Sequence, residues 1–112
     1  LEVLREYNTA IITLTKEDLV KFNYKDGDTE GFVNYPLSIQ GMQVSVIFIE
    51  KEDMVKISFR SKGNVPINAV AAEYFNGGGH MNAAGGRTTE KLNDAILKFK
   101  NVLPAFIESL EK

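Results

Sequence analysis

The sequence contains no cysteine and no tryptophan, and it has one histidine and three prolines. The absence of cysteine excludes disulfide bonds, a thiolate nucleophile and every metal site with a cysteine ligand. A metal-assisted hydrolase needs several Asp, His or Cys ligands around one ion, and a single histidine with no cysteine argues against such a site. We therefore expect no cofactor within these residues. The lack of cysteine also fits a reducing compartment, which we take to be the cytoplasm.

Long apolar runs and a strong charge of one sign are missing as well. No apolar run approaches the ~20 residues that a membrane span requires, and no signal peptide is visible. The formal net charge of −2 argues against a general nucleic-acid coat. Any phosphate binding must therefore come from a local group of basic residues, and we expect no membrane partner.

The 112 residues suit one domain that is large enough to bury its own core. Hydrophobic residues make up 44% of the chain and charged residues 25%, which is ordinary for a globular domain. The first residue is Leu1 rather than Met, and no linker or internal repeat follows it. We expect residues 1–112 to be a single domain of a longer protein.

Runs of β-branched and aromatic residues predict the strands of a sheet. We expect these strands at residues 9–14, 44–50, 54–61 and 87–89. The second strand is apolar almost throughout, as in a strand that is buried on both faces. The third alternates between apolar and polar residues and places Arg60 on its polar side. The turn at 51–53 joins these two strands into a central hairpin.

Capping residues and helical periodicity predict the helices. We expect them at residues 15–22, 29–35, 66–75 and 90–110. Thr15 and Asp18 form a capping box, Pro36 limits the second helix, and Pro104 bends the last one. This order of elements predicts a single α/β domain whose mixed β-sheet is flanked by helices.

Residues 75–87 are the most unusual part of the sequence, because they hold five of the nine glycines and the only histidine. Gly77, Gly78 and Gly79 follow the helix predicted at 66–75. Consecutive glycines lose backbone entropy and pack no side chain, so a fold retains them where φ is positive or a ligand approaches closely. We expect a Gly-rich loop after the helix, and a short helix opening at His80 whose N–H groups bind an anion.

Two other interpretations of this segment are weaker. Gly77 alone fits a helix C-cap, with the other glycines filling a loop, but capping does not explain three glycines, a histidine and a second glycine pair. A nucleotide triphosphate site of the P-loop type requires a Gly-Lys-Ser/Thr ending, which is missing. We therefore interpret the segment as a phosphate-binding turn.

A second group of polar residues, Arg60-Ser61-Lys62, ends the alternating strand. Arginine offers a planar fork for two phosphate oxygens, lysine a point charge and serine a hydroxyl donor. A solvated basic edge is the alternative interpretation. The better explanation is that residues 60–62 and the glycine-rich segment bind the same anion. The candidate site comprises Arg60, Ser61, Lys62, Gly77, Gly78, Gly79 and His80.

The run Gly77-Gly78-Gly79-His80-Met81-Asn82-Ala83-Ala84-Gly85-Gly86 resembles the signature of the DHH-associated C-terminal domain of DHH-family phosphoesterases. Segments 28–37 and 57–63 resemble the nano-RNase branch of that family, the bifunctional oligoribonucleases and 3′-phosphoadenosine 5′-phosphate phosphatases. The resemblance extends from about Thr9 to the C-terminus.

The resemblance implies a division of labour. In the family, a separate N-terminal domain carries an Asp-His-His motif and two divalent metals, usually manganese, whereas the C-terminal domain closes over a cleft and grips the substrate. It implies that Arg60, Gly78, Gly79 and His80 contact a phosphate, with Ser61 and Lys62 beside them. His80 then acts as a transition-state donor in the longer protein. No residue of these 112 is expected to be catalytic alone, and the chain by itself is expected to be inactive.

The partners that the resemblance implies are short single-stranded RNA or nucleotide phosphates, the protein's own N-terminal DHH domain and a second copy in a homodimer. Three alternatives stay open. The first is the tRNA-contacting or oligomerisation module of an alanyl-tRNA synthetase-like protein, although such modules usually carry arginine where this chain has His80. The second is one half of a cyclic-dinucleotide phosphodiesterase. The third is a purely structural dimerisation domain, which predicts no nucleotide binding.

Overall fold

The computed structural model describes residues 1–23 and 29–111 of the chain. Its strands form one six-stranded sheet in the order β1-β2-β3-β4-β6-β5. These strands are β1 Glu2–Leu4, β2 Thr9–Leu14, β3 Val44–Glu50, β4 Val55–Ser61, β5 Gly78–His80 and β6 Ala83–Thr88. β2 and β3 run parallel and the other neighbours run antiparallel, so the predicted mixed sheet is confirmed.

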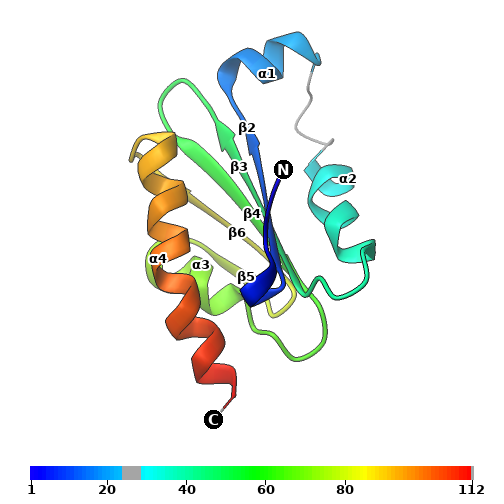
Figure 1. The fold of residues 1–112 in the computed structure, drawn as a ribbon. Helices are drawn as coiled ribbons and strands as arrows, with labels where there is room; N and C mark the ends of the chain where they lie inside the picture. The colour runs from blue at the N-terminus through cyan, green and yellow to red at the C-terminus, as the bar shows by residue number, and fades with distance from the viewer. Residues whose placement is uncertain (24–28, 112) are drawn as a thin grey trace.

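Helices lie on both faces of the sheet (Figure 1). The described helices are α1 Lys16–Lys21, α2 Thr29–Asn34, α3 Asn68–Tyr74 and α4 Leu92–Leu110, with 3-10 helices η1 Arg5–Tyr7 and η3 Tyr35–Ser38. α3 and α4 pack on one face, whereas α1 and α2 pack on the other, over β2 and β3. The predicted fold, a single α/β domain with a central hairpin and flanking helices, is confirmed.

The main core lies between the sheet and helices α3 and α4. Its centre is a group of four fully buried rings whose nearest pairs have centroids 5.7–6.5 Å apart: Phe48, Phe59, Phe75 and Phe99. Each ring contributes roughly 1.5–3 kcal/mol by leaving water. A smaller core on the opposite face joins Val33 of α2 to Ile47 and Ile49 of β3. β3 is thus buried on both faces, as its apolar sequence predicts.

Local signals placed several helix ends correctly. Thr15 and Asp18 form the predicted capping box, with Asp18 N donating to Thr15 Oγ1 at 3.1 Å and Thr15 N to Asp18 Oδ2 at 2.9 Å. Helix α2 ends before Pro36, which lies in η3. Pro104 lies within α4, and the helix continues past it to Leu110.

β1 and β5 were not predicted, and two of the predicted strands differ from the prediction. β6 begins at Ala83 rather than Arg87, because Ala83–Thr88 pairs along its whole length with β4 despite having little β propensity. The side of β4 predicted to be polar is partly buried: Ser58 is 7% exposed, since β4 lies inside the sheet and α2 contacts it. Arg60 on that side is half-buried.

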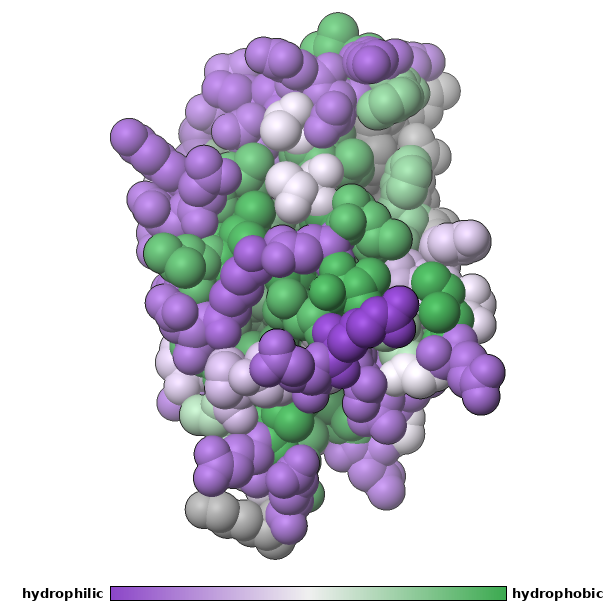
Figure 2. Space-filling view, in the orientation of Figure 1, coloured by the Kyte–Doolittle hydropathy of each residue, from purple (hydrophilic) through white to green (hydrophobic). Residues whose placement is uncertain are grey.

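Hydrophobic residues remain exposed at one edge of the sheet. Figure 2 shows them over β1 and β2, bordered by hydrophilic residues of α4. Leu1 is 74% exposed and Val3 in β1 is 37% exposed. The sheet order places this edge at the opposite end of the sheet from β5.

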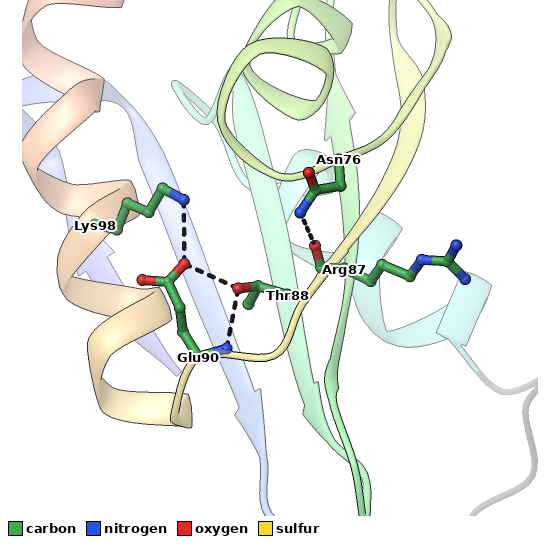
Figure 3. Close-up of polar contacts among 5 residues, drawn as sticks. All are labelled: Asn76, Arg87, Thr88, Glu90 and Lys98. Carbon is green, nitrogen blue, oxygen red and sulfur yellow. Dashed lines mark hydrogen bonds and ion pairs between the residues drawn. The ribbon is translucent and has the colours of Figure 1, made fainter.

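A polar link joins the end of β6 to α4 (Figure 3). Thr88 Oγ1 donates to Glu90 Oε1 at 2.8 Å, and Lys98 Nζ donates to the same oxygen at 3.1 Å. These two hydrogen bonds favour the carboxylate and lower the pKa of Glu90 below its ordinary value of 4.5. The link therefore stabilises the fold only while Glu90 is ionised.

We expect acid to weaken this link. A group whose folded pKa is depressed stabilises the fold above its unfolded pKa, and the free energy of unfolding falls as the pH drops through the folded value. Glu90→Gln should therefore reduce the loss of stability between pH ~6 and pH ~3 in urea unfolding. Glu108→Gln, which removes an exposed carboxylate from α4, is the control. Equal pH dependence of wild type and Glu90→Gln would contradict the assignment.

Candidate phosphate-binding face

The glycine-rich segment forms a β-hairpin. Gly78–His80 is strand β5, and it pairs antiparallel with Ala83, Ala84 and Gly85 of β6. The predicted short helix opening at His80 is wrong, because the backbone groups of residues 78–80 and 83–88 take part in sheet pairing instead. The predicted Gly-rich loop is also not formed as such: the connection between α3 and β5 comprises residues 75–77 with one glycine, while Gly78 and Gly79 belong to β5.

Three of the glycines are required by contacts within the protein. A Cβ atom on Gly77 would overlap the carbonyl oxygen of Gly85 and lie 2.7 Å from the Cα of Gly86. A Cβ atom on Gly86 would lie 2.7 Å from the carbonyl oxygen of Phe75. Gly79 has φ +144°, which L residues with a side chain rarely adopt. Close backbone packing, rather than a ligand, explains these three positions.

The end of α3 also differs from a glycine C-cap. Asn76 has the left-handed conformation there, with φ 54°. Its Nδ2 donates to the carbonyl oxygen of Arg87 at 3.2 Å, and Gly77 N donates to the carbonyl oxygen of Ala71 at 3.0 Å. Asn76 thus ends the helix and fastens β6 beside it, which starts the hairpin in a fixed direction.

The remaining two glycines of the segment leave open space. No atom lies within 4 Å of a Cβ built on Gly78, and only the Ile57 carbonyl oxygen, at 3.7 Å, lies near one built on Gly85. These residues are opposite each other in the β5–β6 pair. They form a flat patch of sheet without side chains.

Strand register brings Arg60 and His80 to the same face. Arg60 is opposite Ala83, and Ala83 is opposite His80. Directly opposite residues of an antiparallel pair share a face, and neighbouring strands are about 4.8 Å apart. The two Cα atoms are therefore roughly 10 Å apart with only a methyl side chain between them. This face is the one opposite α3 and α4, because the alternate residues Phe59 and Ala84 belong to the main core.

Backbone carbonyls orient the arginine. Arg60 Nη1 donates to the carbonyl oxygen of Phe59 at 2.9 Å and to that of Ala84 at 3.4 Å. The guanidinium is therefore held at the boundary between β4 and β6, while His80 on the edge strand β5 is exposed. A planar cation and an imidazole on one side of the sheet can hold an anion between them.

Ser61 and Lys62 are placed differently from Arg60. Ser61 is 6% exposed, faces the other side of β4, and its Oγ donates to the carbonyl oxygen of Val65 at 2.7 Å. Asn82 Nδ2 donates to that Oγ at 2.9 Å, so the serine supports the β5–β6 turn. Lys62 is exposed in the loop after β4.

Sequence reasoning missed three residues of this region. Asn82 fastens the hairpin turn to the loop after β4 through Ser61 and the carbonyl oxygen of Gly63. Lys56 and Arg87 are directly opposite each other on the same face as Arg60. Alternation along 54–61 indicates Lys56, but Arg87 is assigned to this face only by the register of β6. We call Lys56, Arg60, His80 and Arg87 together the basic face.

Within residues 1–23 and 29–111, no group of three or more His, Cys, Asp or Glu side chains is placed to hold a metal ion. Among the same residues, no helix is long and apolar enough to cross a membrane.

Comparison with known proteins identifies the domain. A family model described as the DHHA1 domain matches residues 7–110. The chain belongs to the DHHA1 domain family. The resemblance carried by residues 77–86 is therefore confirmed.

This DHHA1 domain is similar to the bifunctional oligoribonuclease and PAP phosphatase NrnA of Bacillus subtilis, with 38% identity over 73% of the chain and 26% of that protein. It is also 37% identical to a probable NrnA of Streptococcus mutans, over 84% of the chain and 31% of that protein. The domain thus spans about a quarter to a third of the curated relatives that it matches.

Two solved structures share the fold. An exopolyphosphatase-related protein from Bacteroides fragilis superposes with TM-score 0.91 and 46% identity, over 99% of the DHHA1 domain and 33% of that chain. The C-Ala domain of Aquifex aeolicus alanyl-tRNA synthetase superposes with TM-score 0.63 and 15% identity, over 85% of the DHHA1 domain and 89% of that chain. The second likeness extends to the fold alone.

Proposed function

We propose that this DHHA1 domain is the substrate-binding half of a DHH phosphoesterase that hydrolyses short RNA oligonucleotides and 3′-phosphoadenosine 5′-phosphate. The observation that carries the proposal is the placement of Arg60 and His80 on one face, on either side of Ala83. The names of the NrnA relatives support the choice of substrates.

The basic face performs the binding in this proposal. Arg60 donates two N–H groups to oxygens of one phosphate, and His80 donates to a third oxygen from the opposite side. Gly78 lets the ligand approach the backbone of β5, where Gly79 lies between it and His80, while Lys62 adds a point charge at the rim. Ser61 and Gly77 act indirectly, since they hold the hairpin that presents His80.

The hydrolytic step belongs to another part of the longer protein. We assign it to an N-terminal DHH domain, where manganese supplies an activated water when bound. Residues of the DHHA1 domain position the phosphate and neutralise its charge, which is the part of the chemistry that a cation and an imidazole donor perform. A homodimer of the longer protein in the cytoplasm completes the proposal.

A tRNA-contacting or oligomerisation module is a second candidate, because the C-Ala domain has the same fold. Such a module predicts that nucleotide binding does not depend on Arg60 and His80. A third candidate, one half of a cyclic-dinucleotide phosphodiesterase, also predicts nucleotide binding at Arg60 and His80. It differs from the proposed function only in the other domains of the longer protein.

A titration with adenosine monophosphate tests the binding role. We expect weak binding, because half of the cleft is missing, with shifts of the Gly78, Gly79 and His80 amides and of the Arg60 side chain in NMR spectra. Arg60→Gln should weaken this binding about ten-fold, since it removes a charged hydrogen-bond donor. Arg5→Gln is the matched control, because Arg5 lies in η1, which packs against α4.

Absence of any shift at millimolar nucleotide, or shifts spread evenly over the surface, would contradict the proposal. Either result would favour the structural dimerisation domain. If Arg60→Gln binds adenosine monophosphate as tightly as wild type, Arg60 of β4 is not part of the binding site.

A further inference from the structure

The basic face contains a second row of cations besides Arg60 and His80. Lys56 of β4 and Arg87 of β6 are directly opposite each other. Lys56 is four residues from Arg60 along β4, so the two rows are about 13 Å apart at a strand rise of about 3.3 Å. Lys56 is half-buried and Arg87 is exposed.

The second row is costly for the isolated fold. Like charges directly opposite each other in an antiparallel pair repel and destabilise the sheet. Over the described part of the chain, neither side chain forms a hydrogen bond or an ion pair that would offset this repulsion. Figure 3 shows the Arg87 guanidinium pointing away from α4 and from the Thr88–Glu90–Lys98 link. An anion between the two cations would turn the repulsion into attraction.

The surface between the rows is open on β5 and β6. The register positions there are Gly85 and Gly78, and the space beside both is open. Ser58, at the same position on β4, is buried, because β4 lies inside the sheet and α2 contacts it. A backbone-lined strip of β5 and β6 therefore joins the Arg60–His80 row to the Lys56–Arg87 row.

We infer that Lys56 and Arg87 form a second phosphate position, which holds a later phosphate of a single-stranded oligonucleotide whose backbone lies along β6. One phosphate lies between Arg60 and His80, and a later one lies between Lys56 and Arg87. This inference rests on the proposed function. A nucleotide with one phosphate meets only one row, whereas an oligonucleotide meets both. Contacts to phosphates alone bind without regard to base sequence.

Comparing a mononucleotide with a trinucleotide on the 112-residue chain tests the inference. Wild type should bind 5′-phosphorylated triadenylate more tightly than adenosine monophosphate, measured by NMR titration. Arg87→Gln should weaken triadenylate binding about ten-fold and leave adenosine monophosphate binding unchanged. In the Arg87→Gln variant, the affinity for triadenylate should also depend less steeply on salt. The slope of log affinity against log salt concentration should change by about 0.7, the value for one lost phosphate contact on a single strand.

Three variants complete the design. Lys56→Gln should reproduce the effect of Arg87→Gln, and Arg5→Gln, on the α4 side of the sheet, should have none. Arg60→Gln should weaken the binding of both ligands. Thermal unfolding of each variant checks that the sheet is intact.

The failures of the two proposals are distinguishable. If Arg60→Gln weakens both ligands while Arg87→Gln and Lys56→Gln change neither, the second phosphate position is wrong and the proposed function stands. Equal weakening of both ligands by Arg87→Gln also overturns it, because the two rows would then not be separate positions. If Arg60→Gln changes neither ligand, the proposed function itself is wrong.

Discussion

Replacing Gly77 with alanine is expected to lower the free energy of unfolding by about 3 kcal/mol, the upper end of the usual cost of overpacking. The added methyl group would overlap the carbonyl oxygen of Gly85 and press on the Cα of Gly86. Those atoms are backbone, and the β4–β6 ladder fixes them. Gly77 cannot move away either, because its N–H donates to the carbonyl oxygen of Ala71 at the end of α3. Urea unfolding followed by circular dichroism measures the loss.

The neighbouring glycine provides the control for this experiment. Gly78→Ala adds the same methyl group one residue later, where no atom lies within 4 Å of it. Its effect on stability should stay within about 1 kcal/mol, because alanine meets no clash and reduces the entropy of the unfolded chain. Equal losses for the two variants would show that glycine flexibility, rather than close packing, is what position 77 requires.

Under the proposed function, removing the imidazole of His80 is expected to lower kcat of the longer phosphoesterase by about 100- to 1,000-fold, the usual cost of losing one transition-state donor. The hydrogen bond from His80 to a phosphate oxygen should strengthen as negative charge develops there. Loss of this hydrogen bond should therefore lower kcat rather than raise KM. Steady-state kinetics of His80→Ala with a short oligoribonucleotide measures it, with folding checked by circular dichroism.

Arg60 provides the contrasting variant. Arg60 is held in place by the carbonyl oxygens of Phe59 and Ala84. In the proposed function it grips the phosphate equally in the ground state and the transition state. Arg60→Ala should therefore mainly raise KM, and Arg60→Lys should restore binding only in part, since an ammonium lacks the planar fork. Wild-type kinetics for His80→Ala would remove His80 from the mechanism.

Features with a local cause were predictable from the sequence. The capping box of Thr15 and Asp18 depends on residues three positions apart, and both hydrogen bonds form as expected. The almost entirely apolar sequence of Val44–Glu50 indicates burial on both faces, which α2 and α4 provide from opposite sides of β3.

Features that depend on distant pairing were not predictable in the same way. Ala83–Gly86 has no strand-forming side chain, and it becomes a strand because β4 pairs with it. The same pairing places Arg87 opposite Lys56, which no spacing in the sequence indicates. The entropic cost of the glycines indicates correctly that each has a structural reason, but the contacts that explain Gly77, Gly79 and Gly86 lie within the hairpin and its neighbours rather than with a ligand.

The pairing of β4 with β6 also determines when during folding the basic face comes into existence. β3 and β4 form one hairpin, and β5 and β6 form another, each from nearby residues. Local hairpins close faster than contacts between distant segments, such as Val55 with Thr88. Arg60 and His80 belong to different hairpins, so they come to lie on one face only after β4 has paired with β6, which is the slower, non-local step. A nucleotide that needs both therefore binds only the completed sheet and draws the folding equilibrium toward it.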